Sequence, residues 1–269
     1  MLVFPNAKIN IGLNIVEKRP DGFHNIQSCF YPVGWSDALE ITNAEHFSFR
    51  SDGIDIPGNE SDNLCIKAFK MLAADYNIAP VSIHLLKTIP IGAGLGGGSS
   101  DAAFTITALN QHFDLNVPLE KQQDYARRLG SDCAFFILNH PVYCFEKGDQ
   151  FEKIDLKLAG KWIVMVNPGI HISTVEAYAG VVPQTPEKDL RVLLAKPIID
   201  WKHEVKNDFE ATLFSKYHLL REIKESLYEK GAAYAAMSGS GSTIYGIFEQ
   251  QTDLSGHFSE FKMWQGLLK

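Results

Sequence analysis

Long hydrophobic runs, clusters of basic residues and paired cysteines are scarce in this sequence. No apolar stretch approaches the roughly 20 residues of a membrane-spanning helix, so we expect no membrane partner. The 25 Lys and Arg residues face 32 Asp and Glu residues, a net charge of −7, which argues against nucleic acid as a partner. We also expect no signal peptide, because the first residues run straight into a strand-like pattern. Four cysteines without metal-ligand spacing indicate the reduced thiols of a cytoplasmic protein, with no metal held by side chains: Cys29, Cys65, Cys133 and Cys144.

A glycine-rich stretch stands out against this ordinary background, with five glycines within seven positions. It reads Pro90-Ile91-Gly92-Ala93-Gly94-Leu95-Gly96-Gly97-Gly98-Ser99-Ser100. An apolar segment at 81–86 precedes it, and Ala102, Ile106 and Leu109 follow at helical spacing, which predicts a turn between a strand and a helix. Glycine allows backbone N–H groups to approach an anion, and the helix start adds its positive end. We therefore predict a phosphate-binding loop in which Ser99 or Ser100 caps the helix and offers a hydroxyl to a phosphate or to Mg²⁺.

Three better-known glycine loops do not fit this stretch. No Lys follows the glycines, which excludes the Walker form. A dinucleotide-binding loop needs a second strand before its acidic residue, and none precedes Asp114. A protein-kinase loop joins two strands and comes with further motifs that are absent. A flexible linker fits poorly, since ordered segments adjoin the run on both sides, so a nucleotide-phosphate loop of another type remains.

Two N-terminal stretches leave a choice open. Residues 6–15 alternate as in a strand, with Asn6, Lys8, Asn10 and Asn14 on one face. That face is either solvated or, because Asn is a poor strand former, a set of amides that bind a ligand. A turn at 20–22 then leads to Phe23 and His24, which are either structural or able to stack on and hydrogen-bond a heterocycle.

The rest of the chain alternates strands and helices. We expect strands at 26–33, 38–50, 81–86, within 142–154 and at 162–166, and helices at 64–76, 118–129, 174–178 and 208–230. Asp132 precedes an apolar run and is either a helix cap or a catalytic carboxylate. Residues 237–243 join strands at 232–237 and 244–248, either as a second close-approach loop or as a flexible hairpin tip. We place the domain boundary near 158, giving a first domain at 1–158, which contains the glycine-rich stretch, and a second domain at 159–269.

Three of these stretches together resemble the motifs of the GHMP kinase superfamily. Residues 6–10 resemble the first motif, 90–100 the second and 238–243 the third. The resemblance implies an α+β fold, with an N-terminal domain like ribosomal S5 domain 2, a ferredoxin-like GHMP domain and an active site in the cleft between them. More narrowly, the chain is similar to the branch that phosphorylates the 2-hydroxyl of a CDP-linked methylerythritol for isoprenoid synthesis. That similarity rests on residues 7–10, 21–24, 94–103, 130–132, 167–169 and 207–210.

The resemblance also implies residue roles, with ATP and Mg²⁺ as cofactors and a small molecule as partner of a monomer or homodimer. Asp132 would accept the hydroxyl proton, and Lys8 would hold Asp132 and the hydroxyl in place. Residues 90–100 would wrap the ATP phosphates, with Asn63 and Lys87 near the adenosine. The substrate would meet Asn10 through its polar groups, His24 at the cytosine edge, aromatic walls from Phe23, Phe30 and Tyr178, and Thr174 nearby.

The chain departs from the branch at a few positions. Phe23 replaces a usual Tyr, Cys133-Ala134 replaces Val-Pro, and Ala93 replaces a frequent Gly, which predicts a negative φ there. Two other possibilities stay open: a GHMP kinase for homoserine or mevalonate, and an inactive relative that senses a nucleotide or sugar. A cytosine-binding His24 would argue against the first, and the presence of both Lys8 and Asp132 argues against the second.

Overall fold

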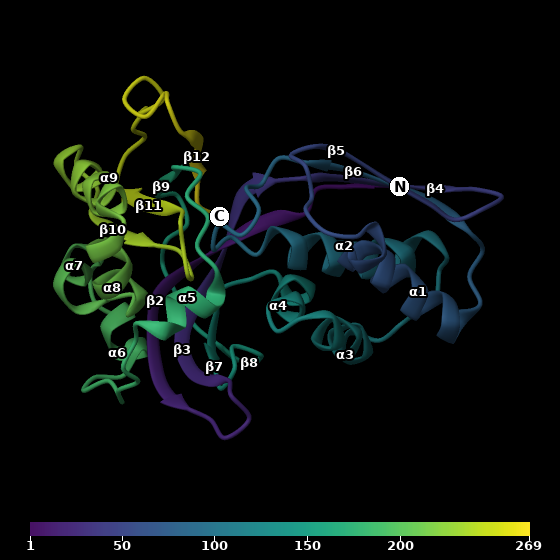
Figure 1. Ribbon diagram of the computed structural model, residues 1–269, viewed down its shortest axis with the longest axis horizontal. Helices are drawn as coiled ribbons and strands as arrows, with labels where there is room; N and C mark the ends of the chain where they lie inside the picture. The colour runs from purple at the N-terminus through teal and green to yellow at the C-terminus, as the bar shows by residue number, and fades with distance from the viewer. The chain divides into compact units, whose positions relative to one another are not determined.

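The computed structural model describes residues 1–269 and contains two compact units (Figure 1). Unit 1 comprises Met1–Ala7, Trp35–Ile91 and Gly96–His140, and unit 2 comprises Lys8–Gly34, Gly92–Leu95 and Pro141–Lys269. The predicted domain boundary near residue 158 divides the chain at one position, whereas each of these units combines three separate segments. That boundary stays a prediction. None of the helices is both long and apolar enough to cross a membrane.

Unit 1 is a sheet with helices packed on it (Figure 1). The strand order is β1-β4-β6-β5, antiparallel except that β5 runs parallel to β6. Its elements are β1 (Leu2–Val3), β4 (Ala38–Asn43), β5 (Ser48–Gly53), η1 (Glu60–Asp62), α1 (Leu64–Tyr76), β6 (Val81–Lys87), α2 (Gly97–His112), α3 (Leu119–Leu129) and α4 (Cys133–Leu138).

The predicted helix ends of unit 1 are confirmed where a local signal marks them. Asn63 precedes α1, and its side chain accepts a hydrogen bond from the backbone N–H of Cys65. Helix α3 ends at Gly130, as predicted. The apolar face of α2 is buried at Ala102, Ile106 and Leu109, so the helical spacing after the glycines identified the helix correctly.

Unit 2 contains most of β2 and β3 and the C-terminal half of the chain. One sheet has the order β2-β3-β7-β8, and a second, antiparallel sheet has the order β10-β11-β9-β12 with α9 against β10 and β11. The elements are β2 (Asn6–Lys18), β3 (His24–Ser36), β7 (Val142–Phe145), β8 (Gln150–Lys153), β9 (Trp162–Asn167), α5 (Thr174–Ala179), α6 (Leu190–Leu194), η2 (Ile198–Asp200), α7 (Trp201–Glu204), α8 (Phe209–Lys216), α9 (His218–Glu229), β10 (Tyr234–Met237), β11 (Ile244–Phe248) and β12 (Lys262–Leu267).

Strand β2 is buried on both faces over its first half. Its apolar side chains are in the core, but Lys8 and Asn10 on the other face are also only 4 % and 2 % exposed. A solvated outer face is therefore wrong for these two residues. Since buried polar groups need partners, this face must contain a polar network.

The single helix predicted at 208–230 is two helices. Tyr217 has ψ 78°, outside the helical region, and separates α8 from α9. Its hydroxyl donates a hydrogen bond to Glu176 on α5. The apolar spacing continues across the break, which is why the sequence pattern did not reveal it.

Candidate active site

The glycine loop has the backbone shape that its sequence predicted. Gly92, Gly94 and Gly96 have φ values of 63°, 77° and 69°, in the left-handed region that glycine favours. Ala93 is not among the residues with positive φ, as its side chain predicted. The loop leads directly into α2, so the alternative of a flexible linker is wrong.

The prediction that Ser99 or Ser100 caps α2 is wrong. The residue preceding the helix is Gly96, and no side chain caps it. Both serines lie within the first turn, because glycines at 97 and 98 let the helix begin earlier than the serines. The first backbone N–H groups of α2 therefore lack a side-chain partner from within the chain and suit an anion.

The third motif packs on the tip of the glycine loop within unit 2. The Ser238 hydroxyl donates to the carbonyl oxygen of Gly94 at 2.7 Å, and the Thr243 N–H donates to Ala93 at 3.3 Å. A side-chain carbon at Gly94 would lie 1.8 Å from the Ser238 carbonyl oxygen, so only glycine fits there. Ser238, Ser242 and Thr243 are fully buried, which identifies a close-approach loop and rules out a flexible hairpin tip.

Lys8 lies beside the same loop. Its backbone N–H donates to the Leu95 carbonyl oxygen at 3.0 Å. Its ammonium donates to Asn10 Oδ1 at 2.5 Å and lies 4.5 Å from the centre of the Phe30 ring. Phe30, predicted as an aromatic wall for the substrate, is only 1 % exposed, and Lys8 lies over its ring.

Asp132 occupies the N-cap position of α4 in unit 1, but its side chain makes no capping hydrogen bond. Burial raises the pKa of the next residue, Cys133, to about 12, and a hydrogen bond with Ser99 opposes that rise. Because Ser99 lies in the first turn of α2, this contact places the half-exposed Asp132 beside the start of that helix. The residues around Asp132 in the sequence suggest only a helix cap, so they do not distinguish a structural role from a catalytic one.

The aromatic residues predicted to meet the substrate lie in unit 2. His24 stacks on Tyr178 with ring centres 4.5 Å apart and planes 22° apart. Burial and the nearby Lys18 lower the pKa of His24, so its imidazole is neutral at pH 7 and can both donate and accept. Phe23 is 59 % exposed with Lys147 above its ring, and Thr174 is exposed at the start of α5.

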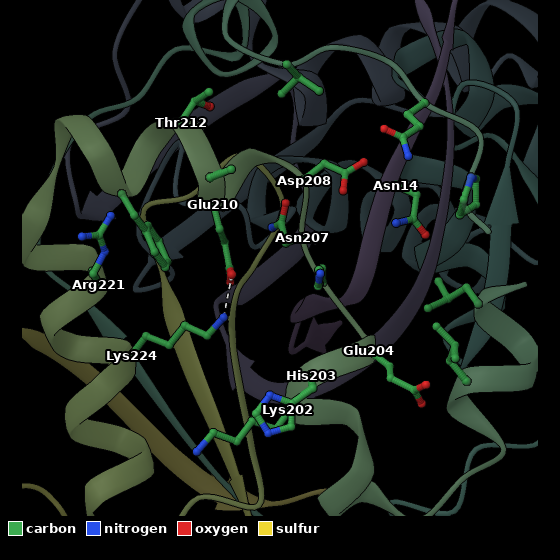
Figure 2. Close-up of a pocket in the computed structure, with 18 of the residues that line it drawn as sticks. Asn14, Lys202, His203, Glu204, Asn207, Asp208, Glu210, Thr212, Arg221 and Lys224 are labelled. Carbon is green, nitrogen blue, oxygen red and sulfur yellow. Dashed lines mark hydrogen bonds and ion pairs between the residues drawn. The ribbon is translucent and has the colours of Figure 1, made fainter. Parts of the chain in front are cut away.

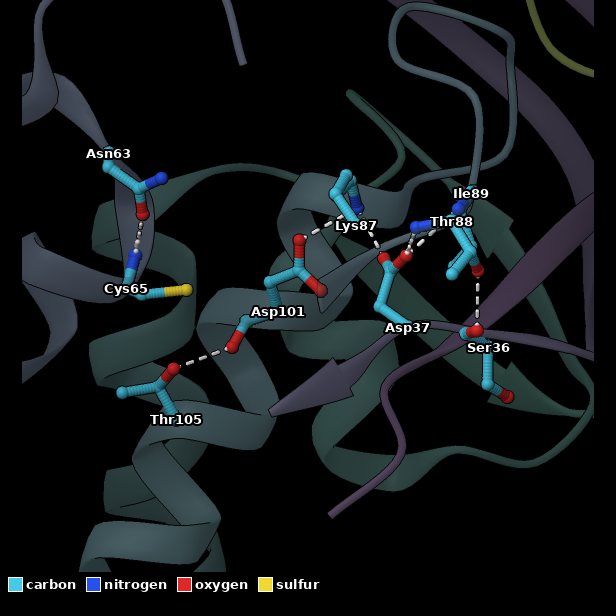
Figure 3. Close-up of polar contacts among 9 residues, drawn as sticks. All are labelled: Ser36, Asp37, Asn63, Cys65, Lys87, Thr88, Ile89, Asp101 and Thr105. Atoms are coloured by element: carbon cyan, nitrogen blue, oxygen red, sulfur yellow. Dashed lines mark hydrogen bonds and ion pairs between the residues drawn. The ribbon is translucent and has the colours of Figure 1, made fainter. Parts of the chain in front are cut away.

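Lys87 is buried in unit 1, 3 % exposed, between two carboxylates (Figure 3). Its ammonium pairs with Asp37 and with Asp101, the latter at 2.8 Å. Burial lowers the pKa of Lys87, but the attraction of the two carboxylates prevails and leaves that pKa raised. A side-chain carbon at Gly97 would lie 2.9 Å from Lys87 Nζ, so the lysine packs directly against the first residue of α2.

Residues 207–210 have a role that sequence reasoning missed. The Asn207 amide donates to the carbonyl oxygens of Met237 and Gly239, both at 2.8 Å, and Glu210 accepts from the Met237 N–H at 2.8 Å. Asp208 accepts from the Ile15 N–H on β2 at 2.7 Å. The segment thus joins the strand of the first motif to the loop of the third. The sequence around this segment indicates only a helix cap. Its other hydrogen-bond partners are remote in the sequence, so no local pattern predicts them.

A cavity of about 1190 Å³ in unit 2 contains none of the predicted site residues. Figure 2 shows Asn207, Asp208 and Glu210 along it, with Glu210 paired to Lys224 at 2.6 Å. Both acidic and basic side chains line its wall. The candidate site is therefore the glycine loop and its surroundings, not this cavity.

Comparisons with known proteins agree with this geometry. Residues 63–140 match the family described as GHMP kinases N terminal domain, and residues 192–255 match GHMP kinases C terminal. A glycine loop that leads into an uncapped helix, in a fold with these two matches, defines a GHMP kinase. The predicted α+β GHMP fold is confirmed.

Two curated relatives and one solved structure narrow the class. The 4-diphosphocytidyl-2-C-methyl-D-erythritol kinases of Cytophaga hutchinsonii and Parabacteroides distasonis are 52% and 46% identical, over 94% and 100% of both chains. A crystal structure of 4-(cytidine 5'-diphospho)-2C-methyl-D-erythritol kinase has a TM-score of 0.84 at 28% identity, covering 99% of this chain and 98% of the other. The chain belongs to the family of 4-diphosphocytidyl-2-C-methyl-D-erythritol kinases.

Proposed function

We propose that this protein transfers the γ-phosphoryl group of ATP to the 2-hydroxyl of 4-diphosphocytidyl-2-C-methyl-D-erythritol. The observation that carries the proposal is the uncapped start of α2 with Asp132 beside it. A helix start binds phosphate oxygens, and a neighbouring carboxylate can accept a proton from an alcohol. The names of the relatives support the choice of alcohol.

In the proposed reaction the hydroxyl oxygen attacks the γ-phosphorus while the bond to the leaving ADP oxygen breaks. Asp132 accepts the hydroxyl proton, and Lys8 acts with Asp132 on that hydroxyl. Phosphoryl transfer has a loose transition state, so positioning and charge stabilisation carry most of the catalysis. The backbone N–H groups of residues 91–100 supply donors for the phosphates, which is consistent with a loop that contains no lysine.

The cytidine group is proposed to bind at His24. A neutral imidazole stacked on Tyr178 presents ring nitrogens that match the donors and acceptors of a cytosine edge. Exposed Phe23 offers a further stacking face, and Thr174 lies on the helix that carries Tyr178. Direct contact of the substrate with Asn10 or Phe30 stays a prediction.

Mg²⁺ is proposed as the counter-ion of the triphosphate, whose charge it would neutralise when bound. No group of three or more His, Cys, Asp or Glu side chains could hold a metal ion here. This fits Mg²⁺, which takes much of its coordination from phosphates and water. Asn63 and Lys87 are proposed near the adenosine, and the four buried cysteines suit a cytoplasmic protein.

A coupled ADP-release assay with Mg-ATP tests the proposal. The CDP-linked methylerythritol, homoserine and mevalonate are offered in parallel at equal concentration. We expect turnover only with the cytidine compound. Turnover with another alcohol would retain the kinase chemistry and refute the cytosine site, whereas ATP binding without any turnover would identify an inactive nucleotide-binding relative.

A further inference from the structure

Lys8 is oriented by a chain of buried polar groups that extends away from the glycine loop. Its ammonium donates to Asn10 Oδ1 at 2.5 Å, and Asn10 Nδ2 donates to Ser28 Oγ on β3 at 2.9 Å. Ser28 in turn donates to the Gly12 carbonyl oxygen at 2.6 Å. We propose that Ser28 is a positioning residue for Lys8 and acts through Asn10, an inference that rests on the function proposed above.

The direction of each hydrogen bond follows from Ser28. Because the Ser28 hydroxyl gives its one proton to Gly12, it can only accept from Asn10. The NH₂ group of Asn10 must therefore face Ser28, and its oxygen must face Lys8. With the amide turned over, two donors would meet at Lys8 and two acceptors at Ser28. The hydroxyl thus selects the one amide orientation that can hold the lysine.

The backbone of Asn10 is fixed independently of its side chain. Its N–H donates to the Ser238 hydroxyl at 3.3 Å, and its carbonyl oxygen accepts from the Tyr245 hydroxyl at 2.7 Å. Only the side-chain torsions of Asn10 are left to be set, and Ser28 sets them. Ser28 is fully buried and Asn10 is 2 % exposed, so water cannot replace either partner.

The steady-state test compares Ser28→Ala with Cys29→Ala. Each variant removes one heavy atom from a fully buried residue of β3, but only the first breaks the chain to Lys8. We expect Ser28→Ala to lower kcat about 10- to 100-fold with both KM values within about threefold, since small misplacements of a reacting group cost up to about 100-fold. Cys29→Ala should keep kcat within about twofold. Equal kcat values for the two variants would refute the positioning role.

A double-mutant cycle separates positioning from general damage. If Ser28 acts through Lys8, adding Ser28→Ala to Lys8→Met should lower the residual kcat by less than about twofold. A merely structural role would instead lower kcat by the same factor in both backgrounds, and that result would overturn the proposal.

A crystal structure of Ser28→Ala tests the geometry without any substrate. We expect the Asn10 amide to turn and the distance from Lys8 Nζ to Asn10 Oδ1 to exceed about 3.5 Å, the outer limit of a hydrogen bond. An unchanged contact would overturn the proposal even if the parent protein phosphorylated a different alcohol. A different result is that the parent fails to turn over the cytidine compound while Ser28→Ala shows the expected displacement of Lys8. That combination would refute the proposed substrate but not the positioning role of Ser28.

Discussion

Replacing Asp101 by Asn should stabilise the protein at neutral and alkaline pH. Asp37, Lys87 and Asp101 place two carboxylates and one ammonium in the core of unit 1, none more than 4 % exposed. Asp37 accepts from Lys87 and from the N–H groups of Thr88 and Ile89, whereas Asp101 Oδ1 has no hydrogen-bond partner. The surplus negative charge therefore lies on Asp101. Asparagine keeps the oxygen that faces Lys87 and removes that charge.

The size of the effect follows from the pKa of Asp101. Burial is the largest cause that raises this pKa, and Asp37 adds to it against the pull of Lys87, so that it rises from 3.8 to about 7. The native state then binds more protons than the unfolded state between about pH 4 and pH 7, and stability falls as the pH rises through this window. At about 1.4 kcal/mol per tenfold change in the protonation constant, the loss reaches at most about 4 kcal/mol above pH 7. The Asp101→Asn variant would avoid this loss.

Urea unfolding of parent and variant between about pH 4 and pH 8 measures this difference. We expect equal stabilities near pH 4 and a gap in favour of Asp101→Asn that grows to at least about 1 kcal/mol at pH 8. Asp37→Asn is the matched control, because it perturbs the carboxylate with three donors and should cost about 3–5 kcal/mol. A variant less stable than the parent at pH 8, with the same pH dependence, would refute the reasoning.

Four further predictions concern the candidate site and the loop beside it. Asp132→Asn should lower kcat by about 10²- to 10⁴-fold and leave the Kd for ATP within about threefold by calorimetry, since a base acts on the transferred proton; an equal loss in both would contradict that role. His24→Phe keeps an aromatic ring on Tyr178 but loses both nitrogens, so the KM for the cytidine substrate should rise about 10- to 100-fold with the KM for ATP unchanged. In the parent, that KM should be flat above pH 7 and should change only in acid, because the pKa of His24 is lowered. Asn207→Asp should lower the free energy of unfolding by about 2–4 kcal/mol in urea, because two buried carbonyl oxygens lose their donors, and unchanged stability would show that the third motif is held by other contacts.

The sequence predicted best those features that depend on nearby residues. The start of α1 at Asn63, the end of α3 at Gly130 and the left-handed glycines of the loop each follow from local backbone chemistry. The strands expected within 142–154 are present as β7 and β8 for the same reason. The resemblance to GHMP kinases then supplied the fold, which no local pattern specifies.

Contacts between remote segments could not be predicted. Ser28 joins Asn10 across two strands, and Asn207 joins a loop 30 residues away. Neither residue type is unusual where it stands, because serine in a strand and asparagine before a helix both have common structural roles. The burial of Lys8 and Asn10 likewise depends on what covers β2, so alternation along the strand did not settle which face meets solvent.

Lys87 and Lys8 both lie near the glycine loop, but the groups that hold their ammonium ions differ in charge. Lys87 is held by two carboxylates, so its positive charge is compensated inside unit 1, and its contact with the start of α2 is one of support. Asn10 and Phe30 hold Lys8 by an amide dipole and a ring face, and neither partner carries a charge. An aspartate at position 10 could accept the same hydrogen bond but would add a negative charge beside Lys8. The proposed role of Ser28 is therefore to fix the amide orientation that holds the Lys8 ammonium, while Asn10 itself adds no charge beside it.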